Sequence, residues 1–141
     1  MPIDNHHIRV LALALIKHRG RFLACAGYDT VKGTAHYRLL GGGVEFGESG
    51  HQALRREIKE ELGIAIKPPK LLGIEENRFV FNGLPGHEIV FLYEVVFQSE
   101  RQYDRESFPI LDSDRGHRAE WISRKNLRGR KLYPLIAKKY L

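Results

Sequence analysis

The chain has 141 residues, 43% of them hydrophobic, and a formal net charge of +6. These values predict one compact domain over residues 1–141 and exclude a disordered chain. The positive balance favours anionic partners such as phosphates, nucleic acid or anionic lipid, although a basic surface can also serve solubility alone.

Two β-like runs are expected near the N-terminus, at residues 8–16 and 21–27, with a turn before the second one. The first run is too short to cross a bilayer and is followed by basic residues, so it is interpreted as a buried strand rather than a signal or membrane segment. Cys25, the single cysteine, excludes an internal disulfide and fits a reducing, cytoplasmic location. Its apolar neighbours indicate a small core residue rather than a nucleophile.

A third short strand is expected at residues 35–40, ended by three glycines at 41–43. A helix should then begin after Ser49, a good N-cap, and stop at Gly63. Within it, apolar residues four apart form one stripe, made by Leu54, Ile58 and Leu62.

The second half of the chain is rich in β signals. A hairpin is expected at residues 71–82 and 88–97, around a turn at Asn82–Gly86. An irregular stretch with a β-like run at 108–111 follows at residues 98–117. The chain is then expected to form a last strand at 118–123 and a last helix at 133–140. A mixed sheet with few helices predicts an α/β or α+β sandwich.

Three glutamates crowd the predicted helix. Glu57, Glu60 and Glu61 are spaced i, i+3 and i+4 and are expected to share a face apart from the apolar stripe. A solvated surface face would explain them, since glutamate is a good helix former. Like charges at this spacing repel, however, and a hard divalent cation such as Mg²⁺ would convert that repulsion into binding.

The segment before the helix favours the metal site. From residue 42 to residue 64 every position of one pattern is filled: Gly42, Glu48, Arg56, Glu57, Ile58, Glu60, Glu61, Gly63 and Ile64. At ordinary residue frequencies, a chance match in a chain of this length is on the order of one in a million.

The stretch GGGVEFGESGHQALRREIKEELGI (residues 41–64) resembles the signature of the Nudix hydrolases. The resemblance implies an α/β/α sandwich with a mixed sheet and a catalytic loop and helix. It also implies metal-dependent cleavage of a phosphoanhydride bond in a nucleoside diphosphate linked to another group, as in a (d)NTP, a nucleotide sugar or a dinucleotide.

The resemblance also implies roles for individual residues. Mg²⁺ or Mn²⁺ would be held by three carboxylates and one main-chain carbonyl, those of Glu57, Glu60, Glu61 and Gly41. Arg56 would orient the glutamates, Glu48 would support the loop, and Gly42 and Gly63 would be structural. Glu57 is the first choice for the base that activates water, directly or through the metal.

A further carboxylate ligand is expected outside the motif. The candidates are Asp112, Asp114 and Glu120, all shortly before Trp121, and Glu120 is preferred. For each of them, an ordinary acid at a loop or strand end is the structural alternative. The motif departs from the family in having Leu40 where many members have proline, a change that removes no ligand.

Substrate contacts are less defined by the sequence. Arg38 is placed to reach a phosphate, and Phe79 or Tyr93 to stack on a base, although aromatic residues along strands are more often core. The sequence carries none of the marks of several substrate subfamilies. An RNA 5′-end pyrophosphohydrolase and a non-catalytic nucleotide sensor therefore stay open as alternatives, and so does a homodimer.

Overall fold

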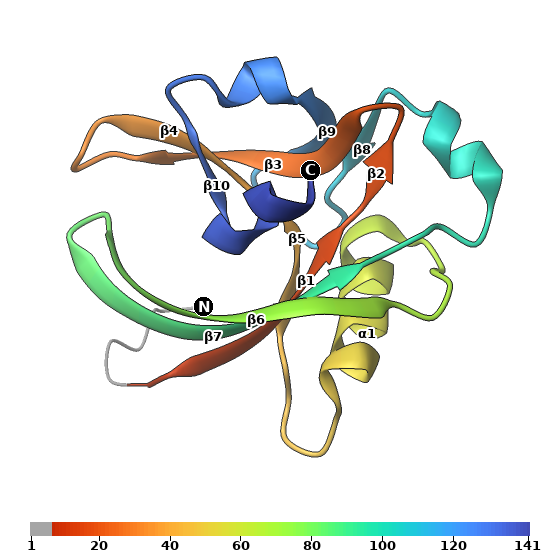
Figure 1. Cartoon of the computed structure of the whole chain (residues 1–141), viewed down its shortest axis with the longest axis horizontal. Helices are drawn as coiled ribbons and strands as arrows, with labels where there is room; N and C mark the ends of the chain where they lie inside the picture. The colour runs from red at the N-terminus through yellow and green to blue at the C-terminus, as the bar shows by residue number, and fades with distance from the viewer. Residues whose placement is uncertain (1–6) are drawn as a thin grey trace.

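The computed structural model describes residues 7–141, which form two β-sheets with one α-helix packed beside them (Figure 1). The strands are β1 (Arg9–Leu15), β2 (Lys17–His18), β3 (Arg21–Asp29), β4 (Thr34–Arg38), β5 (Leu40–Gly43), β6 (Lys70–Phe81), β7 (Leu84–Glu94), β8 (Ser107–Pro109), β9 (Arg118–Ser123) and β10 (Lys131–Tyr133). The helical elements are α1 (Gly50–Leu62) and the 3₁₀ helices η1 (Glu100–Asp104), η2 (Arg124–Leu127) and η3 (Leu135–Tyr140).

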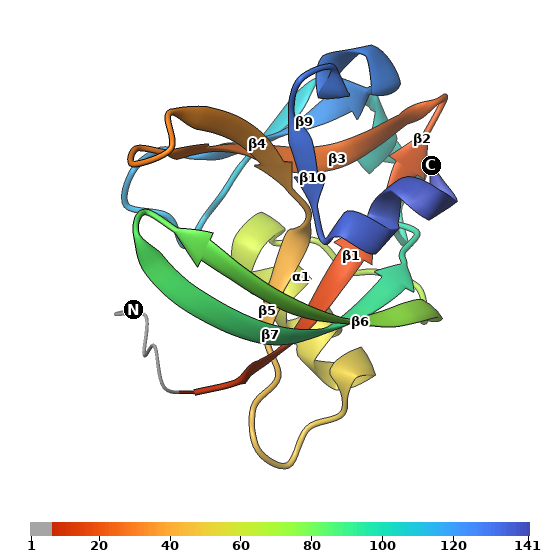
Figure 2. The same cartoon turned by 60° about the vertical axis from the view of Figure 1, so that its left-hand side comes forward.

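Each sheet is mixed. The first sheet has the strand order β5-β1-β7-β6, and its strands β1 and β7 are parallel. The second sheet has the strand order β10-β4-β3-β9-β8, and its strands β10 and β4 are parallel. Strand β2 pairs with β3 beside this second sheet. The expectation of a mixed, helix-poor α+β fold is therefore confirmed. Rotation of the molecule shows that the β3–β4 and β6–β7 hairpins, one from each sheet, extend the same way (Figure 2).

Three local expectations were wrong in detail. The glycines expected to end a strand instead form β5, which pairs antiparallel with β1 from Leu11 to Ala14. The β6–β7 turn contains only Asn82 and Gly83, because the strands continue pairing up to Phe81 and Leu84. The C-terminal helix is a 3₁₀ helix, η3, and it begins only at Leu135 because Tyr133 pairs with Arg38 as part of β10.

Strand β1 lies at the centre of the hydrophobic core and is buried on both faces. Ala12 and Ala14 of β1, together with Ile16 just after the strand, contribute to a cluster with α1. Leu11, Leu13 and Leu15 contribute to a second cluster with β3 and β7. A strand covered on both sides needs an uninterrupted apolar sequence, and this explains the apolar run at residues 10–16.

Helix α1 has the ends that the sequence predicts. The Ser49 hydroxyl accepts a hydrogen bond from the Gln52 amide at 3.1 Å, and the Gln52 side chain accepts one from the Ser49 amide at 2.9 Å. Gly63 ends the helix with a φ of 70°, a left-handed conformation that glycine adopts without steric cost. The predicted stripe of Leu54, Ile58 and Leu62 is buried.

None of the helices in residues 7–141 has the length and apolar character needed to span a bilayer.

Replacement of Ser49 by alanine should lower the free energy of unfolding by about 1 kcal/mol, because the Gln52 amide loses its intramolecular acceptor. Chemical denaturation of Ser49→Ala measures this loss. Ser49→Asp, which keeps a side-chain acceptor, should remain close to the wild type. Equal stabilities for the alanine variant and the wild type would show that the capping box does not contribute.

Candidate metal centre

Arg56 is the hub that joins the loop after β5 to helix α1. Its guanidinium donates to both carboxylate oxygens of Glu48, at 2.7 and 3.2 Å, and to the Gly43 carbonyl at 2.9 Å. On the helix it donates to Glu57 Oε1 at 2.9 Å and to Glu60 at 3.3 Å. One planar cation thus fixes the loop and orients two of the crowded glutamates.

The electrostatics follow from these contacts. The hydrogen bonds from Arg56 hold the pKa of Glu48 below its usual range, and Glu48 is the main reason that the pKa of Arg56 is raised. Glu48 also accepts the Glu45 amide at 2.9 Å, so that it shapes the loop. Arg56 and Glu48 therefore remain a charged pair that supports the site from the side of the loop.

The glycines before the helix are required by the close approach of backbone and carboxylates. Gly41 has a φ of 135°, and a side chain there would collide with the Ala12 carbonyl. A side chain on Gly42 would collide with the carboxylate of Glu57. Strand β5 can therefore lie directly against β1 and the acidic side of α1 only because residues 41 and 42 are glycines.

Glu61 is more buried than the other two glutamates and is not one of the three carboxylates that converge most closely, although the charges of Glu57 and Asp112 act on it. Its residue is only 8% exposed, and its Oε1 accepts the Gly41 amide at 2.9 Å. Burial raises the pKa of Glu61 to about 8, even though the Gly41 hydrogen bond favours the charged form. The contact also brings the main chain of Gly41, whose carbonyl was predicted as a ligand, to the edge of the acidic region.

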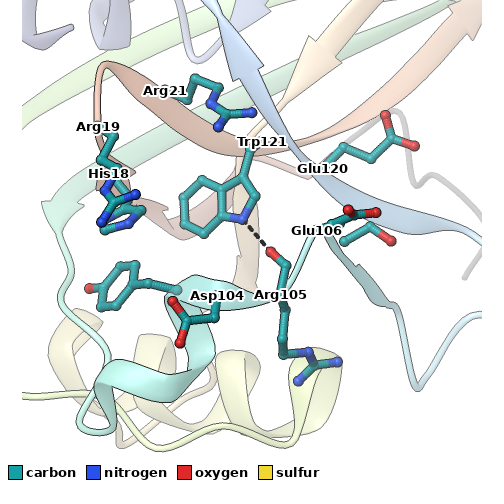
Figure 3. Close-up of a pocket in the computed structure, with 10 residues that line it drawn as sticks. His18, Arg19, Arg21, Asp104, Arg105, Glu106, Glu120 and Trp121 are labelled. Atoms are coloured by element: carbon teal, nitrogen blue, oxygen red, sulfur yellow. Dashed lines mark hydrogen bonds between the residues drawn. The ribbon is translucent and has the colours of Figure 1, made fainter.

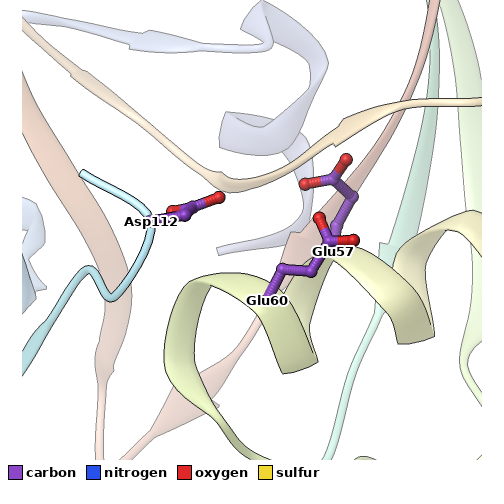
Figure 4. Close-up of side chains that lie close together, drawn as sticks. All are labelled: Glu57, Glu60 and Asp112. Carbon is purple, nitrogen blue, oxygen red and sulfur yellow. The ribbon is translucent and has the colours of Figure 1, made fainter. Parts of the chain in front are cut away.

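The carboxylates that converge are those of Glu57, Glu60 and Asp112, each with an oxygen within 4.8 Å of the others (Figure 4). Asp112 comes from the loop between β8 and β9. This loop is fixed to the end of α1, because the Leu111 amide donates to the Glu61 carbonyl at 2.8 Å. A segment about fifty residues from the helix in sequence thereby supplies the third oxygen.

Glu120, the preferred extra ligand, lies outside this group. It is exposed on β9 and pairs with Ala24 and Ser107. It borders a separate hollow of about 640 Å³ with an aromatic wall, lined by His18, Arg19, Arg21, Tyr103, Asp104, Arg105, Glu106, Ser107 and Trp121 (Figure 3). Asp114 is also exposed and is not part of the group.

The three converging carboxylates fit a hard divalent cation. Oxygens that bind one Mg²⁺ at about 2.1 Å lie at most about 4.2 Å apart, so spacings within 4.8 Å need only small side-chain adjustments. Burial raises the pKa of Glu57, and the nearby charges of Glu60 and Asp112 raise it further against the effect of Arg56. A cation would relieve this repulsion.

The predicted substrate residues differ in their surroundings. Arg38 is exposed at the end of β4, and its charge opposes only in part the burial that raises the pKa of Glu61. Phe79 is half-buried, with its ring on Gly86. The prediction for Tyr93 was wrong: it is only 7% exposed, and its hydroxyl lies against Gly50 under α1, which leaves no ring face for a base.

Comparison with known sequences gives a match over nearly the whole chain to the family described as NUDIX domain, at residues 5–140. The nucleoside triphosphatase NudI of Escherichia coli O139:H28 is 46% identical over 57 residues, which cover 39% of this chain and 40% of that protein. NudI of Enterobacter sp. strain 638 is 39% identical over 66 residues, 43% of this chain and 47% of that protein. The matches span less than half the length of these curated relatives.

Two solved structures share the fold over most of their length. The MutT NUDIX hydrolase from Burkholderia pseudomallei superposes with a TM-score of 0.61 and 27% identity, covering 84% of each chain. A NUDIX hydrolase from Nitrosomonas europaea superposes with a TM-score of 0.56 and 28% identity, covering 94% of this chain and 85% of its own.

Without metal, the stability of the protein should fall as the pH rises from about 4.5 toward 8. In this interval unfolded Glu61 is ionised while folded Glu61 keeps its proton, so the native state binds more protons than the unfolded state and loses stability with rising pH. Glu61→Gln stays neutral and can still accept the Gly41 amide, so this part of the slope should vanish. Denaturant unfolding in EDTA at pH 5 and at pH 8 gives the change in the free energy of unfolding between the two pH values. An equal change in the wild type and in Glu61→Gln would contradict the prediction.

Proposed function

The chain belongs to the NUDIX family, and from this membership we propose that it is a divalent-metal-dependent hydrolase of a phosphoanhydride bond in a nucleoside triphosphate. The observation that carries the proposal is the convergence of Glu57, Glu60 and Asp112 on one point beside the Arg56 hub. A surface helix gains nothing from such an arrangement, whereas a cation that grips a polyphosphate needs it.

The substrate class is taken from the relatives. Both curated relatives are named nucleoside triphosphatases, and one of the solved neighbours is named MutT. Since the matched segments span less than half of those relatives, the activity and the substrate are proposals for this chain. A nucleotide sugar or a dinucleotide shares the same phosphoanhydride chemistry and is the next class to test.

The proposed ligands of Mg²⁺ or Mn²⁺ are the carboxylates of Glu57, Glu60 and Asp112, with the Gly41 carbonyl and Glu61 beside them. When bound, the cation supplies positive charge that neutralises the phosphate oxygens. Arg56 holds Glu57 Oε1, which leaves Oε2 for the metal or for a proton of the attacking water. We keep Glu57 as the proposed base, because burial raises its pKa toward the working range of a general base.

Arg38 is the proposed phosphate contact. No hydrogen bond or ion pair within residues 7–141 engages its side chain, yet its charge acts on Glu61 on one side and on Glu88 on the other. An exposed guanidinium at the border of an acidic centre suits the part of a polyphosphate that the metal does not reach.

Two alternatives share this site. An RNA 5′-end pyrophosphohydrolase would use the same carboxylates, and the net charge of +6 would favour RNA. A non-catalytic sensor explains the site less well than a hydrolase does, because a sensor has no need of a complete set of converging carboxylates. A cytoplasmic location and a homodimer stay predictions of the sequence.

Removal of one proposed ligand should abolish most of the activity while the fold persists. Glu60→Gln and Asp112→Asn are each expected to weaken Mn²⁺ binding and to lower kcat by at least about a hundredfold. Calorimetric titration with Mn²⁺ and release of phosphate or pyrophosphate from a panel of nucleoside triphosphates measure the two effects separately.

Glu120→Gln is the matched control for Asp112→Asn, since both acids are exposed and follow the motif by a similar distance. It should retain Mn²⁺ affinity and activity. Loss of Mn²⁺ binding in Glu120→Gln together with normal binding in Asp112→Asn would reverse the assignment of the third carboxylate.

Replacement of Arg38 by alanine should raise KM for the nucleotide by about tenfold with a smaller change in kcat, because a charge-assisted contact to phosphate is lost. Arg38→Lys should recover part of the loss by restoring the charge without the planar fork. Arg78→Ala, an exposed arginine on β6 paired with His87, should have no effect. An unchanged KM in Arg38→Ala would exclude the proposed contact.

A further inference from the structure

The hollow that borders Trp121 takes no part in the metal centre, and we call it the Trp121 hollow (Figure 3). Its volume of about 640 Å³ is in the range of pockets that hold small ligands, and none of the three converging carboxylates lines it. A second hollow of about 510 Å³ shares His18, Arg19 and Arg21 with it. The two hollows therefore meet at the turn between β2 and β3.

This turn presents an arginine at a position where a side chain is disfavoured. His18 pairs with Arg21, so the turn consists of Arg19 and Gly20 alone, and their φ values are 51° and 75°. Such left-handed values are required by a two-residue hairpin turn, and glycine and asparagine adopt them more readily than arginine does. The turn itself does not explain Arg19, and a retained outlier of this kind points to a use for its guanidinium.

Charges of both signs line the Trp121 hollow without pairing across it. Arg19 and Arg21 lie on the side of the turn, whereas Glu106 and Glu120 lie beyond the indole of Trp121 (Figure 3). Within residues 7–141, none of these four charged side chains takes part in a hydrogen bond or an ion pair. Two guanidiniums and two carboxylates are therefore free to meet a ligand that has an anionic end and a hydrogen-bond-donating end.

Three aromatic rings form the wall between these charges. The rings of Tyr103 and Trp121 are inclined by only 29°, with centroids 6.1 Å apart, and His18 lies 4.7 Å from Tyr103 and 5.9 Å from Trp121. Main-chain groups hold two of the rings, since Trp121 Nε1 donates to the Arg105 carbonyl and the Tyr103 hydroxyl accepts the Phe97 amide, both at 2.9 Å. The wall is thus fixed in place for stacking on a planar group.

The acidic side of the hollow discriminates among bases. An ionised carboxylate only accepts hydrogen bonds, so it is complementary to a base edge that has two adjacent donors. Guanine has such an edge, made by a ring N–H and an amino group, whereas every donor of adenine, cytosine and uracil is flanked by acceptors. Glu106 and Glu120, with Asp104 as a third unpaired carboxylate among the described residues, therefore favour guanine.

The basic side of the hollow suits a phosphate. Arg19 and Arg21 offer planar guanidiniums, which form charge-assisted hydrogen bonds with phosphate oxygens. The adjoining second hollow adds the cations Lys17 and Arg124. A strand that continues beyond one nucleotide would therefore meet further positive charge there.

We propose that the Trp121 hollow is a second binding site, specific for a guanine nucleotide, which is either free or one unit of a single-stranded RNA. Arg19 and Arg21 bind its phosphate, the aromatic wall stacks on its base, and Glu106 and Glu120 accept from the guanine edge. The carboxylates at this hollow do not converge as those of the metal centre do, so the site holds its ligand without hydrolysing it. It is independent of the proposed hydrolase activity.

Trp121 is the single tryptophan of the chain, so its fluorescence reports on this hollow. The titrations are done in EDTA, because without a cation the carboxylates of the metal centre repel phosphate. GMP should quench the emission to saturation. IMP, which lacks only the amino group, should bind at least about fivefold more weakly. A short oligouridylate with one central guanosine distinguishes the two sources of the ligand: much tighter binding than GMP indicates an RNA strand, and equal binding a free nucleotide.

Two double variants and one control assign the contacts. Arg19→Ala with Arg21→Ala should weaken GMP binding by about tenfold or more, because two charge-assisted contacts to phosphate are lost. Glu106→Gln with Glu120→Gln should remove the preference for GMP over IMP. Arg38→Ala, which removes a guanidinium at the metal centre, should bind GMP in the hollow as the wild type does. The arginine double variant should hydrolyse nucleoside triphosphates at the wild-type rate.

The proposal is overturned if neither GMP nor the oligonucleotide gives saturable quenching, or if GMP and IMP bind equally. It is also overturned if Arg38→Ala abolishes the quenching while the arginine double variant retains it. Because these titrations involve no turnover, a protein that hydrolyses no nucleoside triphosphate can still show the binding, and an active hydrolase can lack it.

Discussion

Like-charge repulsion among carboxylates is the constraint on which the site depends. Glu57, Glu60 and Asp112 approach one another at the end of α1, and Glu61 is buried next to them. Such a group is unstable in isolation, and the chain offsets it with one multiply bonded cation, Arg56. Because Arg56 also binds Glu48 and the Gly43 carbonyl, the counter-charge is itself fixed by the loop that it stabilises.

The glycines are the second part of the same arrangement. A strand with side chains at residues 41 and 42 could not lie between β1 and α1. A side chain on Gly41 would collide with the Ala12 carbonyl, and one on Gly42 with the Glu57 carboxylate. As β5, these residues give the sheet an edge whose main chain faces the acids directly, as the hydrogen bond from the Gly41 amide to Glu61 shows. Chain flexibility is therefore secondary here: glycine serves to bring a strand into contact with carboxylates.

Local sequence rules were sufficient for the parts of the site that lie within one stretch of chain. The helix, its caps and its apolar stripe were identifiable from residue type and spacing, whereas the supporting roles of Arg56 and Glu48 followed from the resemblance to the Nudix signature. The burial of Glu61 could also have been predicted, because Glu61 follows Leu54 by seven residues and so lies close to the same side of the α-helix. The contribution of Asp112 was not, since it depends on the bond between the Leu111 amide and the Glu61 carbonyl, which joins segments fifty residues apart.

The contact between the hairpin tips of the two sheets could not be predicted either, since it also joins segments that are distant in sequence. Asn82-Gly83 is recognisable as a turn, but its partner Asp29 can be found only when the packing of two sheets is known. The converging carboxylates come from α1 and from the loop between β8 and β9, whereas side chains of both sheets face each other at His36 and Phe81. The contacts between the two sheets fix the distance between them. In this chain those contacts include the hydrogen bonds at the hairpin tips as well as the apolar core.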